Sequence, residues 1–300
     1  MKQLPGQLTP IFAMLLIGAS AFIYLNCAST QSATYISAQD LGKIGQVDVS
    51  ELTPTELKRF DEIINKEVSP CGNEFSLAQT LLNPNLCPLT PHAAGYVLSL
   101  IMEDYNAEEI STRYVQRYAS VKGMDIDIAN SPQTGAENPS VTVVVFSDFQ
   151  CPFCAKAAKM VKKVTDAYPD DVRLVFKHFP LAEIHPDAML GSRAAYAAFR
   201  QGKFWEMHDT LFSRGAAGFD PEVLRVMAAG LGLDVDRFEE DLVSESAKSA
   251  IEADMALGQK LGVDGTPKIF VNGRVLEGGV NALEDRIREE FLRNKYLKKN

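Results

Sequence analysis

The chain has 300 residues, with 39 acidic and 30 basic side chains and a net charge of −9 at pH 7. An acidic chain without a basic cluster argues against nucleic acid as a partner. The four histidines follow no metal-binding spacing, and no glycine-rich phosphate loop is present, so we expect neither a metal nor another cofactor. The length indicates one large or two ordinary domains.

The chain begins with a segment typical of export. Residues 11–25 are almost all apolar and carry no charge. This run is shorter than the about 20 residues that a membrane-spanning helix needs, and it indicates a signal segment over residues 1–28. Cys27 follows it directly, as in a lipoprotein signal that would lipidate this cysteine. Ordinary cleavage nearby and an uncleaved anchor are the alternatives.

The polar stretch 29–50 is predicted to be a tether. We therefore expect an exported protein of the bacterial periplasm or cell envelope, with a membrane tether or lipid anchor at its N-terminus.

Residues 51–120 predict a small all-α domain. Thr53 and Glu56 have the spacing of a capping box, and several segments with apolar residues at helical spacing follow. Cys71 and Cys87 could close a loop with a disulfide worth roughly 3 kcal/mol in the chain-entropy model. We expect this structural bridge, although two reduced buried cysteines or a second redox pair would fit the same positions.

A predicted linker, 121–139, leads into the stretch that carries the chemistry. Residues 141–146 are five β-branched side chains and a phenylalanine, which predict a buried strand. A C-x-x-C motif follows at Cys151 and Cys154, and the sequence becomes helical from Ala155. The motif therefore lies where a strand meets the N-terminus of a helix.

That position favours redox chemistry. Pro152 suits the first position of a helix, where its missing N–H costs nothing. Unpaired N–H groups and the helix dipole there lower the pKa of the Cys151 thiol, and the thiolate is its reactive form. Cys154 lies one turn further in and should resolve a mixed disulfide formed at Cys151. A structural disulfide and half a zinc site are the alternatives, and the strand–CPFC–helix order disfavours both.

The second half of the chain completes an α/β domain. Residues 171–179 predict a second, parallel strand, and about eighty residues of helical pattern follow, with the insertion proper at about 182–262. Thr266 and Pro267 then lead into a strand, a hairpin with an Asn-Gly turn and a last amphipathic helix at 282–297.

This order of elements resembles the DsbA-like branch of the thioredoxin-fold disulfide oxidoreductases. The similar runs are SDFQCPFC at 147–154, KHFPL at 177–181, HP at 185–186 and GKFWEMHD at 202–209. The resemblance implies a thioredoxin fold with a helical insertion over residues 140–297, preceded by the small all-α domain. It also implies that Pro267 is cis, faces the C-x-x-C motif and lets Thr266 offer its backbone to a substrate peptide.

Two positions depart from that family. Strong oxidants often carry histidine between the cysteines, whereas Phe153 cannot donate a hydrogen bond to the Cys151 thiolate. Val145 stands where several relatives have an acid. Asp148 is then either an exposed turn residue or the proton acceptor of Cys154.

Two histidines, His178 and His185, flank the turn after the second strand. They either pack and cap there or modulate Cys151.

We therefore expect a thiol:disulfide oxidoreductase that acts on cysteine-containing proteins through Cys151 and Cys154, with Pro152, Phe153, Asp148, Thr266 and Pro267 in supporting positions. A redox partner would recycle the pair. A disulfide reductase or isomerase with the same pair, and a non-catalytic peptide-binding module, are the alternatives.

Overall fold

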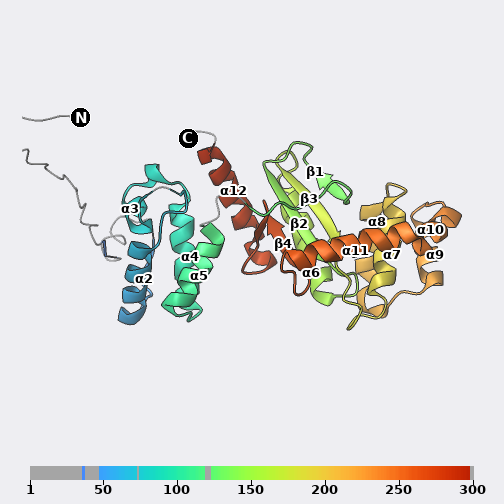
Figure 1. Ribbon diagram of the computed structural model, residues 1–300, viewed down its shortest axis with the longest axis horizontal. Helices are drawn as coiled ribbons and strands as arrows, with labels where there is room; N and C mark the ends of the chain where they lie inside the picture. Colours follow the sequence, from blue (N-terminus) through green and yellow to red (C-terminus); the bar gives the residue numbers. More distant parts are fainter. Residues whose placement is uncertain (1–35, 38–46, 73, 119–122, 298–300) are drawn as a thin grey trace, which may run out of the picture. The chain divides into compact units, whose positions relative to one another are not determined.

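The computed structural model describes residues 36–37, 47–72, 74–118 and 123–297 (Figure 1). These residues belong to one of the two compact units into which the chain divides. The predicted signal segment, Cys27 and most of the tether lie outside the described residues. Among the residues that are described, no helix combines the length and apolar character needed to cross a membrane.

The first part of the described chain is helical. Thr53 and Glu56 form the predicted capping box at the start of the first helix, and Ser76 and Gln79 form a second one. Burial of apolar side chains such as Phe60 between the helices makes a separate hydrophobic core. The helices are α2 (Pro54–Lys66), α3 (Leu77–Leu82), α4 (Thr90–Met102) and α5 (Ala107–Tyr118), with a 3-10 turn η1 (Pro84–Leu86).

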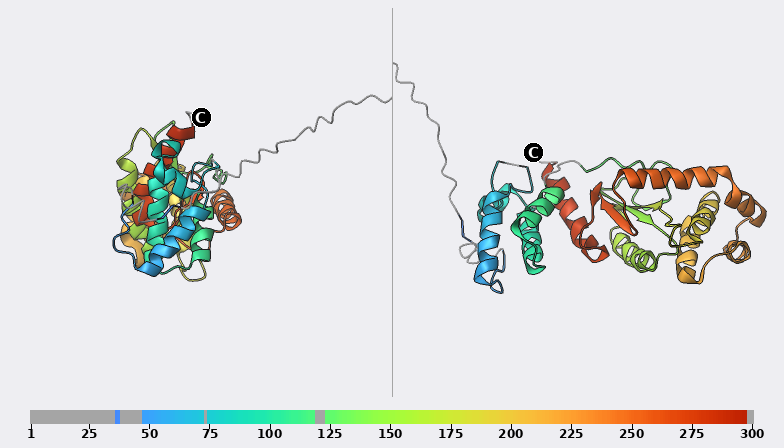
Figure 2. Two further views of the ribbon diagram at one scale, coloured as in Figure 1. Left: turned by 90° about the vertical axis from the view of Figure 1, so that its left-hand side faces the viewer. Right: turned by 60° about the horizontal axis from the view of Figure 1, so that its bottom comes forward.

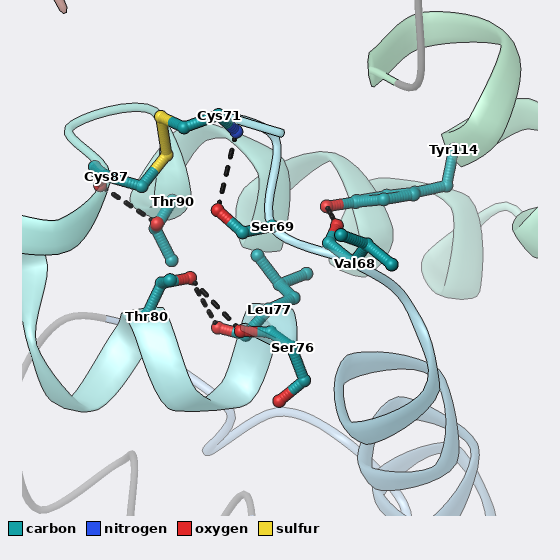
Figure 3. The surroundings of a disulfide bond; sticks show 9 residues. All are labelled: Val68, Ser69, Cys71, Ser76, Leu77, Thr80, Cys87, Thr90 and Tyr114. Carbon is teal, nitrogen blue, oxygen red and sulfur yellow. Dashed lines mark hydrogen bonds between the residues drawn. A yellow bond between two sulfur atoms is a disulfide. The ribbon is translucent and has the colours of Figure 1, made fainter. Parts of the chain in front are cut away.

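A disulfide joins Cys71 and Cys87 across the loops on either side of α3, with the two Cα atoms 5.7 Å apart (Figure 3). Cys87 is fully buried, and its carbonyl oxygen accepts a hydrogen bond from the Thr90 hydroxyl at 2.9 Å. The Cys71 N–H donates to the Ser69 hydroxyl at 3.4 Å. The bridge therefore joins the two loops that flank α3 and η1, between α2 and α4.

A five-stranded sheet, ordered β1-β3-β2-β4-β5, forms the centre of the second part. The pair β2–β3 is parallel, and the other pairs are antiparallel. The predicted hairpin turn is confirmed, because Asn272 and Gly273 both have positive φ between β4 and β5. The strands are β1 (Gln133–Gly135), β2 (Val141–Ser147), β3 (Val172–His178), β4 (Lys268–Val271) and β5 (Arg274–Val275).

Strand β1 lies inside the stretch that the sequence predicts to be a linker. Its residues have no apolar pattern of their own, and they pair with the outer edge of β3. Backbone hydrogen bonds from Phe176 to Pro132 and from Ala136 to Val172 hold both ends. The edge of β3, and not the local sequence, therefore makes this segment a strand.

Helices cover both faces of the sheet. Val143 and Val145 of β2 pack with α6 (Pro152–Asp166) and α12 (Leu283–Leu297). Val144 and Phe146 point to the other face, which α11 (Glu245–Lys260) covers. Figure 2, right, shows α11 on one side of the strands and α6 on the other.

The helical insertion lies between β3 and β4, within the predicted range. Side-chain caps from Asp220, Asp234 and Ser244 begin its last three helices. Its core includes Phe149 and Cys154, so the insertion packs directly behind the C-x-x-C motif. The helices are α7 (Ala188–Phe199), α8 (Phe204–Arg214), α9 (Pro221–Gly230), α10 (Val235–Val243) and α11, with a 3-10 turn η2 (Gly215–Ala217) after α8. A further 3-10 turn, η3 (Val280–Ala282), precedes α12.

Candidate active site

Cys151 lies at the N-cap of α6, directly after the loop that leaves β2. Pro152 occupies the first helical position, as its fixed φ favours. Both cysteines are free thiols, with only 4% of Cys151 and 1% of Cys154 exposed. The strand–helix junction therefore holds two reduced sulfur atoms, of which Cys151 is slightly the more exposed.

The surroundings of Cys151 stabilise its thiolate. A hydrogen bond with Cys154 and the backbone N–H groups of Cys154 and Phe153 lower the pKa of the Cys151 thiol to about 5, against the opposing effect of burial. Those N–H groups belong to the first turn of α6, where no carbonyl of the helix can accept them. The acidity follows from the position that the sequence predicts.

Cys154 has the opposite character. Burial, and then its hydrogen bond with Cys151, raise the pKa of the Cys154 thiol. The two cysteines are thus inequivalent: the low pKa of Cys151 favours its thiolate, whereas Cys154 is a thiol that must lose a proton before it can react.

The loop before β4 faces Cys151. The peptide bond between Thr266 and Pro267 is cis, as the resemblance implied. Cys151 Sγ lies 3.4 Å from the carbonyl oxygen of Thr266, which accepts a hydrogen bond from the thiol. The backbone of Thr266 therefore lies beside the reactive sulfur.

A groove extends from the active-site end of α6 to the loops around β4. Phe153 stands at one side of this groove with 71% of its surface exposed, which is unusual for a large apolar side chain. The groove offers apolar surface together with the ammonium groups of Lys156 and Lys268, the second of which binds Asp264 at 3.1 Å. Its lining includes Phe153, Lys156, Met160, Pro267, Lys268 and Val280.

Asp148 is fully buried, so its interpretation as an exposed turn residue is wrong. One carboxylate oxygen accepts the N–H of Gln150 at 2.8 Å. The other accepts the N–H of Leu181 at 2.9 Å and lies 2.7 Å from Nδ1 of His185. The carboxylate therefore ties the active-site loop to the chain after β3, and His185 contacts Asp148 and not Cys151.

Two contacts near the site were not anticipated from the sequence. Gln150 accepts the N–H of Asp187 through its side-chain oxygen at 2.6 Å, which joins the loop to the start of α7. His208 and Asp209 of α8 line a pocket that also contains Cys154. The only sequence signal for this pair was its place in the run GKFWEMHD, because neither residue has a motif spacing to the cysteines.

Within the described ranges, no group of three or more His, Cys, Asp or Glu side chains lies close enough together to hold a metal ion.

The sheet order, the C-x-x-C motif at a helix N-terminus and the neighbouring cis-proline loop define a thioredoxin-fold protein of the DsbA-like class. The family model of the DSBA-like thioredoxin domain matches residues 142–292, and the chain belongs to this family. The predicted α/β fold, with its helical insertion and the helices that precede it, is thereby confirmed.

Solved structures and curated proteins with similar sequences cover different shares of the chain. A thioredoxin-like oxidoreductase from Silicibacter pomeroyi is 31% identical, with a TM-score of 0.49 over 56% of this chain and 94% of that one. BdbD from Bacillus subtilis is 24% identical, with a TM-score of 0.49 over 57% and 97%. The Na(+)/H(+) antiporter NhaA 3 of Salinispora tropica is 40% identical over 147 residues, which are 49% of this chain and 22% of the antiporter. The match thus spans under a quarter of that curated relative.

Proposed function

We propose that this protein is an exported thiol:disulfide oxidoreductase that exchanges disulfides with cysteine-containing proteins through Cys151 and Cys154. One observation carries the proposal: a thiol with a pKa of about 5 lies at a helix N-terminus, above a buried second thiol and beside the Thr266 carbonyl. A stabilised thiolate paired with a protonated resolving thiol is the arrangement that thiol–disulfide exchange needs.

In the oxidising direction the reaction starts from the Cys151–Cys154 disulfide. A substrate thiolate attacks Cys151 Sγ, the bond between the two cysteines breaks, and Cys154 leaves as a thiolate that takes up a proton. A second substrate thiolate then attacks the substrate sulfur of the mixed disulfide and releases Cys151 as its stabilised thiolate. Two electrons have moved from the substrate to the cysteine pair, and a redox partner must remove them to restore the disulfide.

The acidity of Cys151 bears on the direction of this exchange. A stabilised thiolate favours the reduced pair and makes the disulfide more oxidising. Its surroundings lower the pKa of the Cys151 thiol to about 5. We therefore propose disulfide donation by a moderate oxidant, in keeping with the replacement of the usual histidine by Phe153.

Substrates should bind as extended polypeptide along the cis-proline loop. The backbone of Thr266 lies beside Cys151, where it can pair with a substrate strand. The groove next to it combines the exposed ring of Phe153 with Lys156 and Lys268. Apolar side chains with a nearby acid are the substrate features that such a groove complements.

The test is turnover of protein disulfides. Wild type should reactivate scrambled ribonuclease and reduce insulin in the presence of glutathione, and Cys151→Ser should lose at least 99% of both activities because the attacking sulfur is gone. Ser213→Ala, an exposed substitution on α8, is the matched control and should retain wild-type rates. Equal activity in wild type and Cys151→Ser would leave only a non-catalytic peptide-binding module.

The N-terminal predictions belong to the same proposal. We propose that residues 1–28 direct export and that Cys27 carries a lipid anchor, on the basis of the apolar run before it. Metabolic labelling with a fatty acid should mark wild type and not Cys27→Ala. Absence of label from both would remove the anchor and leave the redox function untouched.

A further inference from the structure

A pocket of about 120 Å³ lies behind the resolving cysteine, between α6, α8 and strands β2 and β3. Cys154 lines it from the first turn of α6, and Ser147 from the end of β2. His208 and Asp209 line it from α8. A water molecule needs roughly 15 Å³ and a few polar partners, so the pocket has room for several. The pocket therefore joins the Cys154 thiol to an ionisable pair on another helix.

The imidazole of His208 is held in one orientation. Its side chain is 8% exposed, and Nδ1 lies 2.9 Å from a carboxylate oxygen of Asp209. The hydrogen bond with His208 lowers the pKa of the Asp209 carboxyl. Because Nδ1 is bound to Asp209, Nε2 is the ring nitrogen that would take up a proton from the pocket. Aromatic rings pack around the imidazole: Phe149, Phe176, Phe204, Trp205 and Phe212.

Other ionisable groups near Cys154 are poorly suited to exchange its proton. The carboxylate of Asp148 already binds two backbone N–H groups and His185. Complete burial lowers the pKa of His178 to about 4, so this imidazole is a weak base. Lys162, which also lines the pocket, binds Asp166 at 2.8 Å. The charged or ionisable groups that face His208 are therefore Asp209, Lys162, Cys154 and His178.

We propose that His208, positioned by Asp209, is the proton acceptor and donor of Cys154, with the proton moving through the pocket directly or along water. This inference rests on the proposed redox function. It identifies the residue that exchanges the proton of Cys154, a step that the burial of Cys154 makes difficult. When a mixed disulfide on Cys151 is resolved, the Cys154 S–H bond breaks and its proton goes to Nε2. The Cys154 thiolate then attacks Cys151 Sγ, and the departing thiol takes the electron pair of the broken S–S bond.

In the oxidising direction the same pair works in reverse. Cys154 leaves the disulfide as a thiolate, and protonated His208 returns the proton to it. The carboxylate of Asp209 stabilises the imidazolium in the interval between these steps. Several relatives have an acid at the position of Val145, and a valine has no ionisable group. His208 and Asp209 would therefore supply the proton exchange that Val145 cannot.

The two sulfur atoms can be followed separately with 5,5′-dithiobis(2-nitrobenzoate) in a stopped-flow experiment. Cys151 of the reduced protein attacks the reagent and releases one thionitrobenzoate, at a rate that depends on reagent concentration. Cys154 then resolves the mixed disulfide and releases a second one, at a rate that does not. The second phase in wild type should slow as the pH is lowered, because a protonated base cannot accept the Cys154 proton.

In His208→Gln the second phase should be roughly 10- to 100-fold slower at pH 7, the lower part of the range for general-base catalysis, and should lose this pH dependence. The first phase should be unchanged. His92→Gln, a histidine of α4, is the matched control and should behave as wild type in both phases. An unchanged second phase and pH profile in His208→Gln would overturn the proposal.

Asp209→Asn is a second variant, for use if His208→Gln does not fold. It keeps the imidazole of His208 packed among its aromatic neighbours. Loss of the carboxylate should move the pH profile of the second phase to lower pH, because the imidazolium is no longer stabilised. A profile that does not move would overturn the relay. If wild type released no second thionitrobenzoate, the redox function itself would fail, and the two failures are thus distinguishable.

Discussion

Cys151 owes its acidity to neighbours within four residues along the chain, together with a loop that is distant in sequence. The nearest contributors, Cys154 and the N–H of Phe153, are fixed once the motif begins a helix. Sequence analysis could therefore predict the low pKa of the Cys151 thiol. It could not predict the contribution of the Thr266 side chain, which depends on how β4 pairs with β2.

The hydrogen bond from Cys154 is the largest contributor to this acidity, so its removal should be measurable. In Cys154→Ala the side-chain donor is lost while the backbone N–H groups remain, and the pKa of Cys151 should rise above the wild-type value of about 5. Cys154→Ser keeps a hydroxyl donor in the same place and should show a smaller rise. Thiolate absorbance near 240 nm, followed against pH, reports both values. Equal pKa values in wild type and Cys154→Ala would show that the backbone N–H groups alone stabilise the thiolate.

The same pKa predicts how the stability of the reduced protein depends on pH. The folded value of about 5 lies below the value of about 8.5 for an unfolded cysteine. The thiolate therefore stabilises the folded state fully above about pH 8.5, and this contribution is lost as the pH falls to about 5. Urea unfolding of reduced wild type and Cys151→Ala should show a free-energy difference that shifts in favour of wild type from pH 5 to 8.5. A pH-independent difference would contradict the low pKa.

The role of Asp148 could not be predicted from the residues near it in the sequence. The sequence placed an acid next to the motif, and both an exposed turn residue and a partner of Cys154 were reasonable roles. Its actual partners include Leu181 and His185, which reach it only because β3 runs parallel to β2. The role of a buried carboxylate depends on such distant partners, whereas the role of Cys151 depends mostly on near ones.

At the scale of elements, α11 lies unusually close to the sheet at one glycine. A Cβ atom added to Gly258 would lie 2.7 Å from ring atoms of Phe179 and 3.1 Å from the ring of Phe146. Both rings are buried and stack edge to face at 6.3 Å, so neither can move freely. The glycine thus sets the distance between α11 and strands β2 and β3.

Gly258→Ala should therefore destabilise the protein by about 1–3 kcal/mol, the usual cost of overpacking a core. Gly230→Ala at the end of α9 is the matched control, because no atom outside its own helix and neighbouring residues lies within 4 Å of the added Cβ. It should be neutral or stabilise by up to about 1 kcal/mol. Chemical denaturation of the two variants measures both effects, and a neutral Gly258→Ala would mean that α11 can shift outward.

Elements with strong local signals were predicted from sequence. The capping box at Thr53 and the hairpin turn at Asn272 were expected and are present. Strand β1 was missed, because Gln133 and its neighbours pair with β3 without any alternation of apolar residues. A periodic pattern of apolar residues identifies a helix or strand that buries one of its faces. It gives no signal for a strand that is held only by backbone hydrogen bonds.

For the described molecule as a whole, charged side chains connect the first helices to the second part. Arg117 of α5 binds Glu289 of α12 at 2.7 Å, and both side chains are nearly buried. The hydroxyl of Tyr118 donates to the same carboxylate at 3.1 Å, and Arg286 binds its other oxygen at 2.9 Å. In the sequence these residues resemble the exposed charges of ordinary amphipathic helices, so the contact between α5 and α12 could not be predicted.

Breaking this contact should weaken the described molecule without touching its chemistry. Arg117→Met should lower the free energy of unfolding by about 3 kcal/mol, the lower end for loss of one partner of a buried pair, because Arg286 still binds Glu289. Turnover of insulin should stay at the wild-type rate, since the cysteines belong to α6. Lys58→Met, which removes an exposed charge on α2, is the control and should change stability by less than about 0.5 kcal/mol.

A double variant separates the ionic contact from loss of packing around Arg117. In a Glu289→Gln background, Arg117→Met should cost less than in wild type, because no buried carboxylate is left with one partner fewer. If the cost is the same in both backgrounds, the guanidinium stabilises the protein mainly through its contact with the ring of Tyr96, whose centroid lies 4.2 Å away. Arg117 would then act mainly within the first helices, through a cation–π contact between α5 and Tyr96 of α4, and its ion pair with α12 would contribute little to stability.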